Sequence, residues 1–106
     1  MKYEEVNKKL AIKKRELLKQ GSSCFFCLKP GDSKSLTLAH LIRRSYSKEF
    51  IFDDRNLVLA CMSCHTIYDD GYGLKLKFLH NLDKALLRVK EMDELYYNRV
   101  IDRSNR

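Results

Sequence analysis

The chain has 106 residues, a formal net charge of +7 at pH 7, an apolar fraction of 44% and four cysteines. A chain of this length has room for one small core, so we expect residues 1–106 to form a single domain that needs a metal, disulfides or a second subunit for added stability. The apolar content excludes wholesale disorder, and no apolar run approaches the roughly 20 residues of a membrane span. The basic excess suits nucleic acid, although many small basic proteins bind none.

The hydrophobic pattern predicts an N-terminal helix over residues 2–20, with an apolar stripe, basic residues on its other faces and a stop at Gly21. Five elements are expected next: a turn at 22–34, a strand at 35–42, a polar loop at 43–56, a strand at 57–60 and a short helix at 63–70. One long helix is predicted from about residue 74 to 100, because apolar residues recur there at three- and four-residue steps. The domain thus divides into a basic helix (1–21), a core (22–70) and a C-terminal helix (71–106), whose length leaves room for a homodimer seam.

Two C-x-x-C pairs carry the strongest signal in the sequence, and their members are Cys24, Cys27, Cys61 and Cys64. The first residues lack the apolar stretch of a signal peptide, so we expect an intracellular, cytoplasmic setting in which paired thiols bind metal more often than they form disulfides. Two such pairs complete a closed tetrahedral site, which predicts one structural Zn²⁺ and lowers the net charge to about +5. Redox-active pairs and an iron–sulfur site are the alternatives, but no βαβ pattern surrounds either pair.

The separation of the two pairs carries further information. Simple zinc ribbons separate their pairs by roughly 15 to 20 residues, whereas 33 residues lie between Cys27 and Cys61. This insertion contains both predicted strands, so the metal would clamp the two ends of a hairpin. His40 lies on the first strand and His65 directly follows the last cysteine, so we expect the two imidazoles to face one cleft. Asn56 precedes the second strand, where its amide can tie the loop to the strand that carries His40.

These residues resemble a known family. Residues 39–42 (Ala-His-Leu-Ile) and 55–65 (Arg-Asn-Leu-Val-Leu-Ala-Cys-Met-Ser-Cys-His) resemble the HNH nucleases of the ββα-metal fold, and most closely the phage NinG recombination proteins. The layout is also similar to that of the endonuclease VII resolvases, which hold zinc with two C-x-x-C pairs. The resemblance covers about residues 22–70 and implies an α+β fold: a zinc-stapled ββα-metal (HNH, treble-clef) core between N- and C-terminal helices.

The resemblance implies a metal-dependent DNA endonuclease that hydrolyses phosphodiester bonds, selective for branched or single-stranded DNA in phage-type recombination. His40 takes the position of the general base, for which an imidazole with an ordinary pKa near 6.5 is suited. His65 takes the position of a ligand to a catalytic Mg²⁺ or Mn²⁺, and Asn56 orients the loop beside His40. The DNA contacts are expected from basic residues of the polar loop, namely Arg43, Arg44, Lys48 and Arg55.

The sequence departs from the HNH pattern at Ala39. Many HNH motifs carry a metal-binding Asp immediately before the base histidine, and an alanine cannot bind a metal. Because a hard cation requires oxygen ligands, a replacement carboxylate is needed. Asp69 is the first candidate, since it lies four residues after His65 and would share a helix face with it. The other candidates are Asp70, Asp53 and Asp54.

Structural roles remain open for each of these residues. His65 can support the zinc site through a hydrogen bond, and Asn56 is a common residue before a strand. A non-catalytic zinc-containing DNA-binding module is therefore the principal alternative to the nuclease. A protein-interaction adaptor that uses the terminal helices is the third hypothesis.

Overall fold

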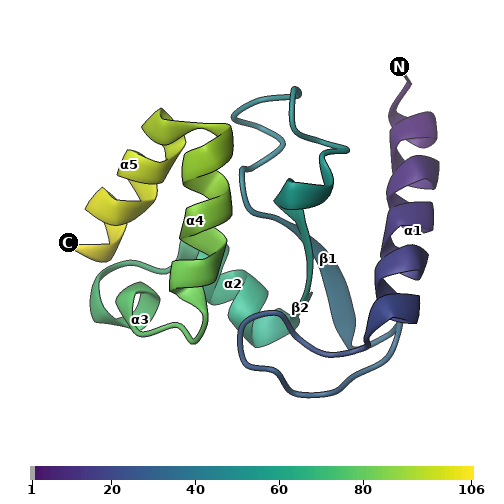
Figure 1. Cartoon of the computed structure of the whole chain (residues 1–106), viewed down its shortest axis with the longest axis horizontal. Coiled ribbons are helices and arrows are strands. Elements are labelled where there is room, and N and C mark those ends of the chain that lie inside the picture. Colours follow the sequence, from purple (N-terminus) through teal and green to yellow (C-terminus); the bar gives the residue numbers. More distant parts are fainter. Residues whose placement is uncertain (1) are drawn as a thin grey trace.

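A two-stranded hairpin lies at the centre of the molecule, with one long helix on one side and a group of shorter helices on the other (Figure 1). The computed structural model describes residues 2–106. Within that range the chain has an α+β fold with these elements: α1 (Tyr3–Gln20), β1 (Leu36–His40), the 3₁₀ turn η1 (Asp54–Asn56), β2 (Leu57–Cys61), α2 (Met62–Asp70), α3 (Gly73–Lys77), α4 (Leu82–Met92) and α5 (Glu94–Ser104). Up to residue 70, the observed helices and strands follow the predicted order, with ends that differ by one or two residues.

Helix α1 attaches to the hairpin through a narrow apolar stripe. Leu10 is the buried residue of this helix, which contacts both β1 and β2. Two lysines add polar contacts: Lys13 Nζ lies 2.7 Å from Asp54 Oδ1, and Lys14 Nζ donates to the Ser33 carbonyl at 2.8 Å. Most of the other residues of the helix are exposed, and many of them are charged. No helix within residues 2–106, α1 included, is long and apolar enough to cross a membrane.

Strands β1 and β2 form an antiparallel pair in which Leu36 lies opposite Cys61 and His40 lies opposite Leu57. The first four residues of β2 are all buried, because α1 and α2 both contact this strand. A continuous apolar run is typical of a strand that is covered on both faces. The hairpin therefore fixes the end of β2, where the second cysteine pair begins, relative to the residues of β1.

The single helix expected from about residue 74 to 100 is wrong, because this segment forms α3, α4 and α5. The first break precedes α4, where Asn81 has a left-handed backbone (φ 60°) that an α-helix does not allow. The second break is at Asp93, whose backbone is extended and whose side chain accepts a hydrogen bond from the Tyr96 amide at 3.0 Å. Such a contact caps the start of α5. Buried apolar residues recur on both sides of each break, so periodicity alone does not reveal the breaks.

Aromatic packing joins the cysteine-containing turn to α2. Phe26 is fully buried, and its ring stacks on that of Tyr68 with centroids 5.4 Å apart. The Tyr68 hydroxyl donates to the Leu41 carbonyl at 2.6 Å, just beyond the end of β1. These contacts hold the turn, the hairpin and α2 together around one core.

Candidate functional site

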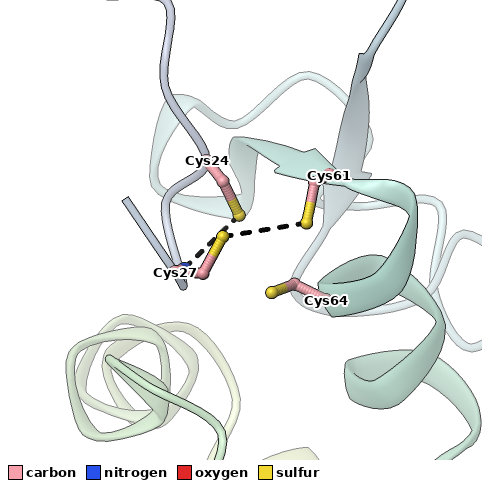
Figure 2. Close-up of side chains that lie close together, drawn as sticks. All are labelled: Cys24, Cys27, Cys61 and Cys64. Carbon is pink, nitrogen blue, oxygen red and sulfur yellow. Dashed lines mark hydrogen bonds between the residues drawn. The ribbon is translucent and has the colours of Figure 1, made fainter. Parts of the chain in front are cut away.

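The four cysteines converge from three parts of the chain. Cys24 and Cys27 lie in the turn before β1, Cys61 ends β2, and Cys64 lies in the first turn of α2. Figure 2 shows the four sulfur atoms turned toward one another. All four lie within 4.8 Å of one another, and the sulfurs of Cys27 and Cys61 are 3.8 Å apart.

This geometry fits a tetrahedral metal site. Ligand sulfurs about 2.3 Å from a zinc ion are about 3.8 Å apart in a regular tetrahedron, which matches the separation of Cys27 and Cys61. All four cysteines are free thiols rather than disulfide partners. The cluster can therefore hold a metal ion such as zinc, with all four positions filled by protein sulfur.

Backbone hydrogen bonds shape the turn that holds the first pair. The amide of Cys24 donates to the Lys29 carbonyl at 2.9 Å, and the amide of Leu28 donates to the Cys24 carbonyl at 3.0 Å. Leu28 has a left-handed backbone (φ 65°), which allows the chain to reverse directly after Cys27. The Phe25 amide then donates to the Leu59 carbonyl of β2 at 2.7 Å. The first pair is thereby docked beside the strand that ends at Cys61.

The local environment favours ionisation at one cysteine and opposes it at others. Burial disfavours the Cys24 thiolate, but backbone amides, with that of Cys61 foremost, outweigh it and lower the pKa of Cys24 to about 7. Burial and neighbouring sulfurs raise the pKa of Cys64. Full ionisation of the cluster therefore requires a cation, which a divalent metal supplies.

A cavity of about 780 Å³ lies between α1, β1 and α2, and none of the four cysteines lines it. It falls within the range of roughly 300–1,000 Å³ that is typical of ligand pockets. Both predicted histidines line it, together with three other residues that the sequence singled out: His40, His65, Asp69, Arg43 and Arg44. We call this cavity the histidine cleft.

His65 and Asp69 form a close pair in α2. The imidazole Nε2 lies 3.1 Å from Asp69 Oδ2, and Nδ1 lies 2.7 Å from the Thr37 hydroxyl. Because that hydroxyl also lies 2.8 Å from the Ala60 carbonyl, it donates there and accepts from Nδ1–H. The Nε2 lone pair of a neutral His65 would then face the Asp69 carboxylate, so a proton or a metal ion must lie between them. Accordingly, the Asp69 carboxylate raises the pKa of His65.

The separation of this pair also suits a divalent cation. Two adjacent ligands of an octahedral ion, each about 2.1 Å from it, are about 3.0 Å apart. The side chains of His65 and Asp69 are 24% and 28% exposed, so solvent reaches both. Within residues 2–106, the cysteines are the group in which three or more possible metal-binding atoms converge, whereas His65 and Asp69 are only a pair. A bound ion would take its remaining ligands from water or substrate, as Mg²⁺ commonly does.

A backbone contact holds His40 in place, and burial favours the neutral form of its imidazole. Its Nε2 lies 3.1 Å from the Ile51 carbonyl, so this nitrogen carries the proton and Nδ1 carries the lone pair. Burial, with a contribution from the positive charge of Arg44, outweighs this hydrogen bond and lowers the pKa of His40. The imidazole is therefore an unprotonated base at neutral pH.

Asn56 is completely buried at the start of β2 and makes three side-chain hydrogen bonds. Its Oδ1 accepts from the Ile42 amide at 2.6 Å, and its Nδ2 donates to the carbonyls of Ile42 and Phe50, both at 3.1 Å. Asn56 thus joins the two ends of the polar loop. This loop also carries the Ile51 carbonyl that holds His40, so Asn56 acts on the histidine only indirectly.

Arg43 and Arg44 line the histidine cleft, but Arg43 is partly engaged elsewhere. Arg43 Nη2 donates to the carbonyl of Asp69 and to the Asp70 carboxylate, the latter at 2.9 Å. Its Nε and Nη1 take no part in these two contacts. Asp70 is therefore paired with Arg43 rather than directed to His65.

Lys48 and Arg55 are exposed and are absent from the lining of the cleft, although both lie within the described residues. Arg55 forms a bidentate pair with Asp53: its Nε donates to Oδ1 at 3.1 Å and its Nη2 donates to Oδ2 at 2.7 Å. Asp54 pairs with Lys13 of α1. The structure therefore separates these basic residues, and the carboxylates of Asp53 and Asp54, from the two histidines.

Several residues of the site have no signal in the sequence motifs. Asn7, Leu10 and Lys14 of α1 line the cleft, because α1 docks along the hairpin. Periodicity identifies the apolar stripe of α1 but not the surface that it covers. Thr37 could have been identified from the hairpin register, which places it opposite Ala60, one residue before Cys61.

Comparison with protein-family models, curated proteins and solved structures yields no match to this chain. The class of protein must therefore be inferred from the chain itself. Two features are available for that purpose: a four-cysteine cluster that can hold zinc, and the histidine cleft.

Proposed function

We propose that this chain is a metal-dependent DNA endonuclease with a zinc-stabilised core of the HNH type, which cuts branched or single-stranded DNA in phage-type recombination. One observation carries the proposal: His40, His65 and Asp69 line a single cleft together with basic side chains. A neutral base, a pair of cation ligands and phosphate-binding groups are the components that phosphodiester hydrolysis requires.

His40 is the proposed general base. Its protonated Nε2 is fixed on the Ile51 carbonyl, which leaves the Nδ1 lone pair to accept a proton from the attacking water. The lowered pKa of His40 keeps that lone pair available at neutral pH. Asn56 is the proposed positioning residue, since it holds the loop that contains Ile51.

His65 and Asp69 are the proposed ligands of the catalytic ion. The carboxylate of Asp69 supplies the oxygen ligand that Ala39 cannot, and the 3.1 Å separation of the pair fits adjacent positions around one ion. A bound Mg²⁺ or Mn²⁺ would neutralise charge on the phosphate and on the leaving 3′-oxygen. Arg44, and the free nitrogens of Arg43, would hold the substrate phosphate in the cleft.

The proposal is tested by incubating the purified zinc-containing protein with junction, flap and duplex DNA in the presence of Mg²⁺ or Mn²⁺. Wild type is expected to cut at least one of these substrates, whereas His40→Ala and Asp69→Asn are expected to lose cutting. The matched control is His80→Ala, which removes an exposed imidazole from the turn between α3 and α4. Cutting by His40→Ala at the wild-type rate would refute the assignment of His40 as the base.

A non-catalytic zinc-containing DNA-binding module is the second candidate. It is favoured by the direct contact of His65 with Asp69, because a protonated imidazole satisfies that contact without any metal ion. This candidate predicts salt-dependent DNA binding by wild type and by Asp69→Asn alike, with no cleavage under any divalent ion. Cleavage by wild type that Asp69→Asn abolishes would exclude it.

A further inference from the structure

A second cavity, of about 540 Å³, opens between the loop that follows β1 and helix α5. Its lining is notable for four arginines: Arg43, Arg99, Arg103 and Arg106. We call it the arginine cavity. Three of these arginines belong to the C-terminal segment, outside the part of the chain that resembles HNH nucleases.

The charges around the arginine cavity are largely uncompensated. Asp102 is the single carboxylate among the lining residues, so the lining has a net charge of about +3. Within residues 2–106, Arg99, Arg103 and Arg106 have no carboxylate within ion-pair distance. Of the four arginines that line the cavity, only Arg43 forms an ion pair, with Asp70. Like charges gathered in one cavity repel each other, and this repulsion is relieved when an anion binds.

Two of the arginines are held in place by contacts that leave their charges unneutralised. The guanidinium of Arg99 lies 4.9 Å from the centroid of the Tyr46 ring. Arg103 Nη2 donates to the Tyr68 carbonyl, while its Nε is buried and has no hydrogen-bond partner among the described residues. A buried donor without a partner costs free energy, so Arg103 is held in place at some cost to stability. Guanidinium groups match phosphate oxygens in both charge and geometry.

The arginine cavity adjoins the histidine cleft. Arg43 and Ser45 line both cavities. A polynucleotide whose scissile phosphate lies beside His40 would therefore meet the arginine cavity along its backbone.

We infer that the arginine cavity is a backbone-phosphate subsite, which holds a phosphodiester of the same DNA strand that enters the histidine cleft. The subsite deepens the proposed function and rests on it. It also assigns the C-terminal helix a direct part in substrate binding. A DNA backbone and a free phosphate ion both carry the phosphate oxygens that suit this cavity, and the occupant is the DNA backbone.

The test measures the salt dependence of binding to a fluorescently labelled single-stranded oligonucleotide, by anisotropy, without added Mg²⁺ or Mn²⁺ so that no cutting occurs. The variant is Arg99→Gln with Arg106→Gln, both of which are exposed and far in sequence from the cysteines. The matched control is Lys84→Gln with Arg88→Gln, which removes two charges from a different cavity and, like the first variant, one arginine–aromatic contact, that of Arg88 with Phe25.

Each lost single-strand phosphate contact is expected to reduce the log–log salt slope by about 0.7. The variant should therefore bind with a slope shallower by about 0.7 to 1.4, and the control should keep the wild-type slope. Substitution of the same two arginines by lysine should restore the slope, because the charge is retained. This rescue also separates loss of binding from loss of folding.

Equal slopes for the Arg99→Gln, Arg106→Gln variant and the control would overturn the subsite, even if wild type cleaves DNA. A slope that falls only in that variant supports the subsite, even if wild type fails to cleave and the nuclease proposal is thereby lost. Competition is measured with inorganic phosphate against sodium chloride at equal ionic strength. If phosphate displaces the strand from wild type but not from the variant, the two compete for the cavity, which supports the backbone subsite. If phosphate binding depends on the two arginines while strand binding does not, the cavity binds free phosphate, and the assignment to a DNA backbone is overturned.

Discussion

Replacement of Asn56 by alanine tests how the polar loop is held beside His40. The variant removes the partners of the Ile42 amide and the Ile42 carbonyl, and one of two partners of the Phe50 carbonyl, which keeps a bond from the Asp53 amide. Two buried groups left without partners cost about 1–3 kcal/mol each, and a third lost hydrogen bond costs about 1 kcal/mol. We therefore expect a loss of about 3–7 kcal/mol, a large part of the roughly 5–15 kcal/mol available to a small domain.

The assay is urea denaturation followed by circular dichroism, at a fixed zinc concentration because metal release shifts the apparent stability. With an m value of about 1.5 kcal/mol per molar, the midpoint should fall by about 2–5 M. Asn81→Gly is the matched control, since it removes a single hydrogen bond, from Asn81 Nδ2 to the Phe25 carbonyl at 3.0 Å, at a left-handed position that glycine accepts. Equal losses for the two variants would refute the account of Asn56 as the anchor of the loop.

Two further predictions concern the metal and the pH. The purified protein should contain one zinc ion per chain, and its complete removal should abolish cooperative thermal unfolding, because structural zinc contributes about 10–16 kcal/mol in small zinc domains; a cooperative transition that survives metal removal would contradict this. Burial lowers the pKa of His40, whose neighbours include Arg44, His65 and Asp69. Below the unfolded pKa near 6.5 the unfolded chain therefore binds more protons than the native one at this site, so stability should fall as the pH is lowered from about 7.5 to about 5.5. Over this pH range the melting temperature of His40→Gln should fall less than that of wild type. An equal fall in the two melting temperatures would refute the burial of His40.

The elements up to residue 70 could be predicted because their signals are local. The basic helix, the two short apolar strands and the short helix that contains Cys64 each have a distinct pattern, and the structure moves their ends by one or two residues. The C-terminal segment could not be divided correctly from hydrophobic periodicity, since the apolar stripe continues across both breaks. The break at Asp93 could nevertheless have been predicted from the sequence, because Asp is a common N-cap residue at the start of a helix.

The cysteine cluster followed from spacing alone, because each C-x-x-C pair is local and the hairpin joins them. The i,i+4 spacing also predicted that Asp69 lies beside His65, and their contact is observed. The wall that α1 contributes to the histidine cleft depends on tertiary docking, for which no local pattern exists. The same holds for the arginine cavity, which joins Arg43 to residues of α5 more than fifty positions later.

The most direct test of the central claim is the single-turnover rate of Mg²⁺-dependent cleavage of a branched DNA, with wild type and His40→Ala both loaded with zinc and equally folded. Loss of a general base slows a reaction by about 10²- to 10⁴-fold. We therefore expect wild type to cut and His40→Ala to be at least about 100-fold slower, with unchanged DNA affinity. Absence of cutting by wild type, or equal rates for the two proteins, would contradict the proposal that His40 serves as the base of a nuclease.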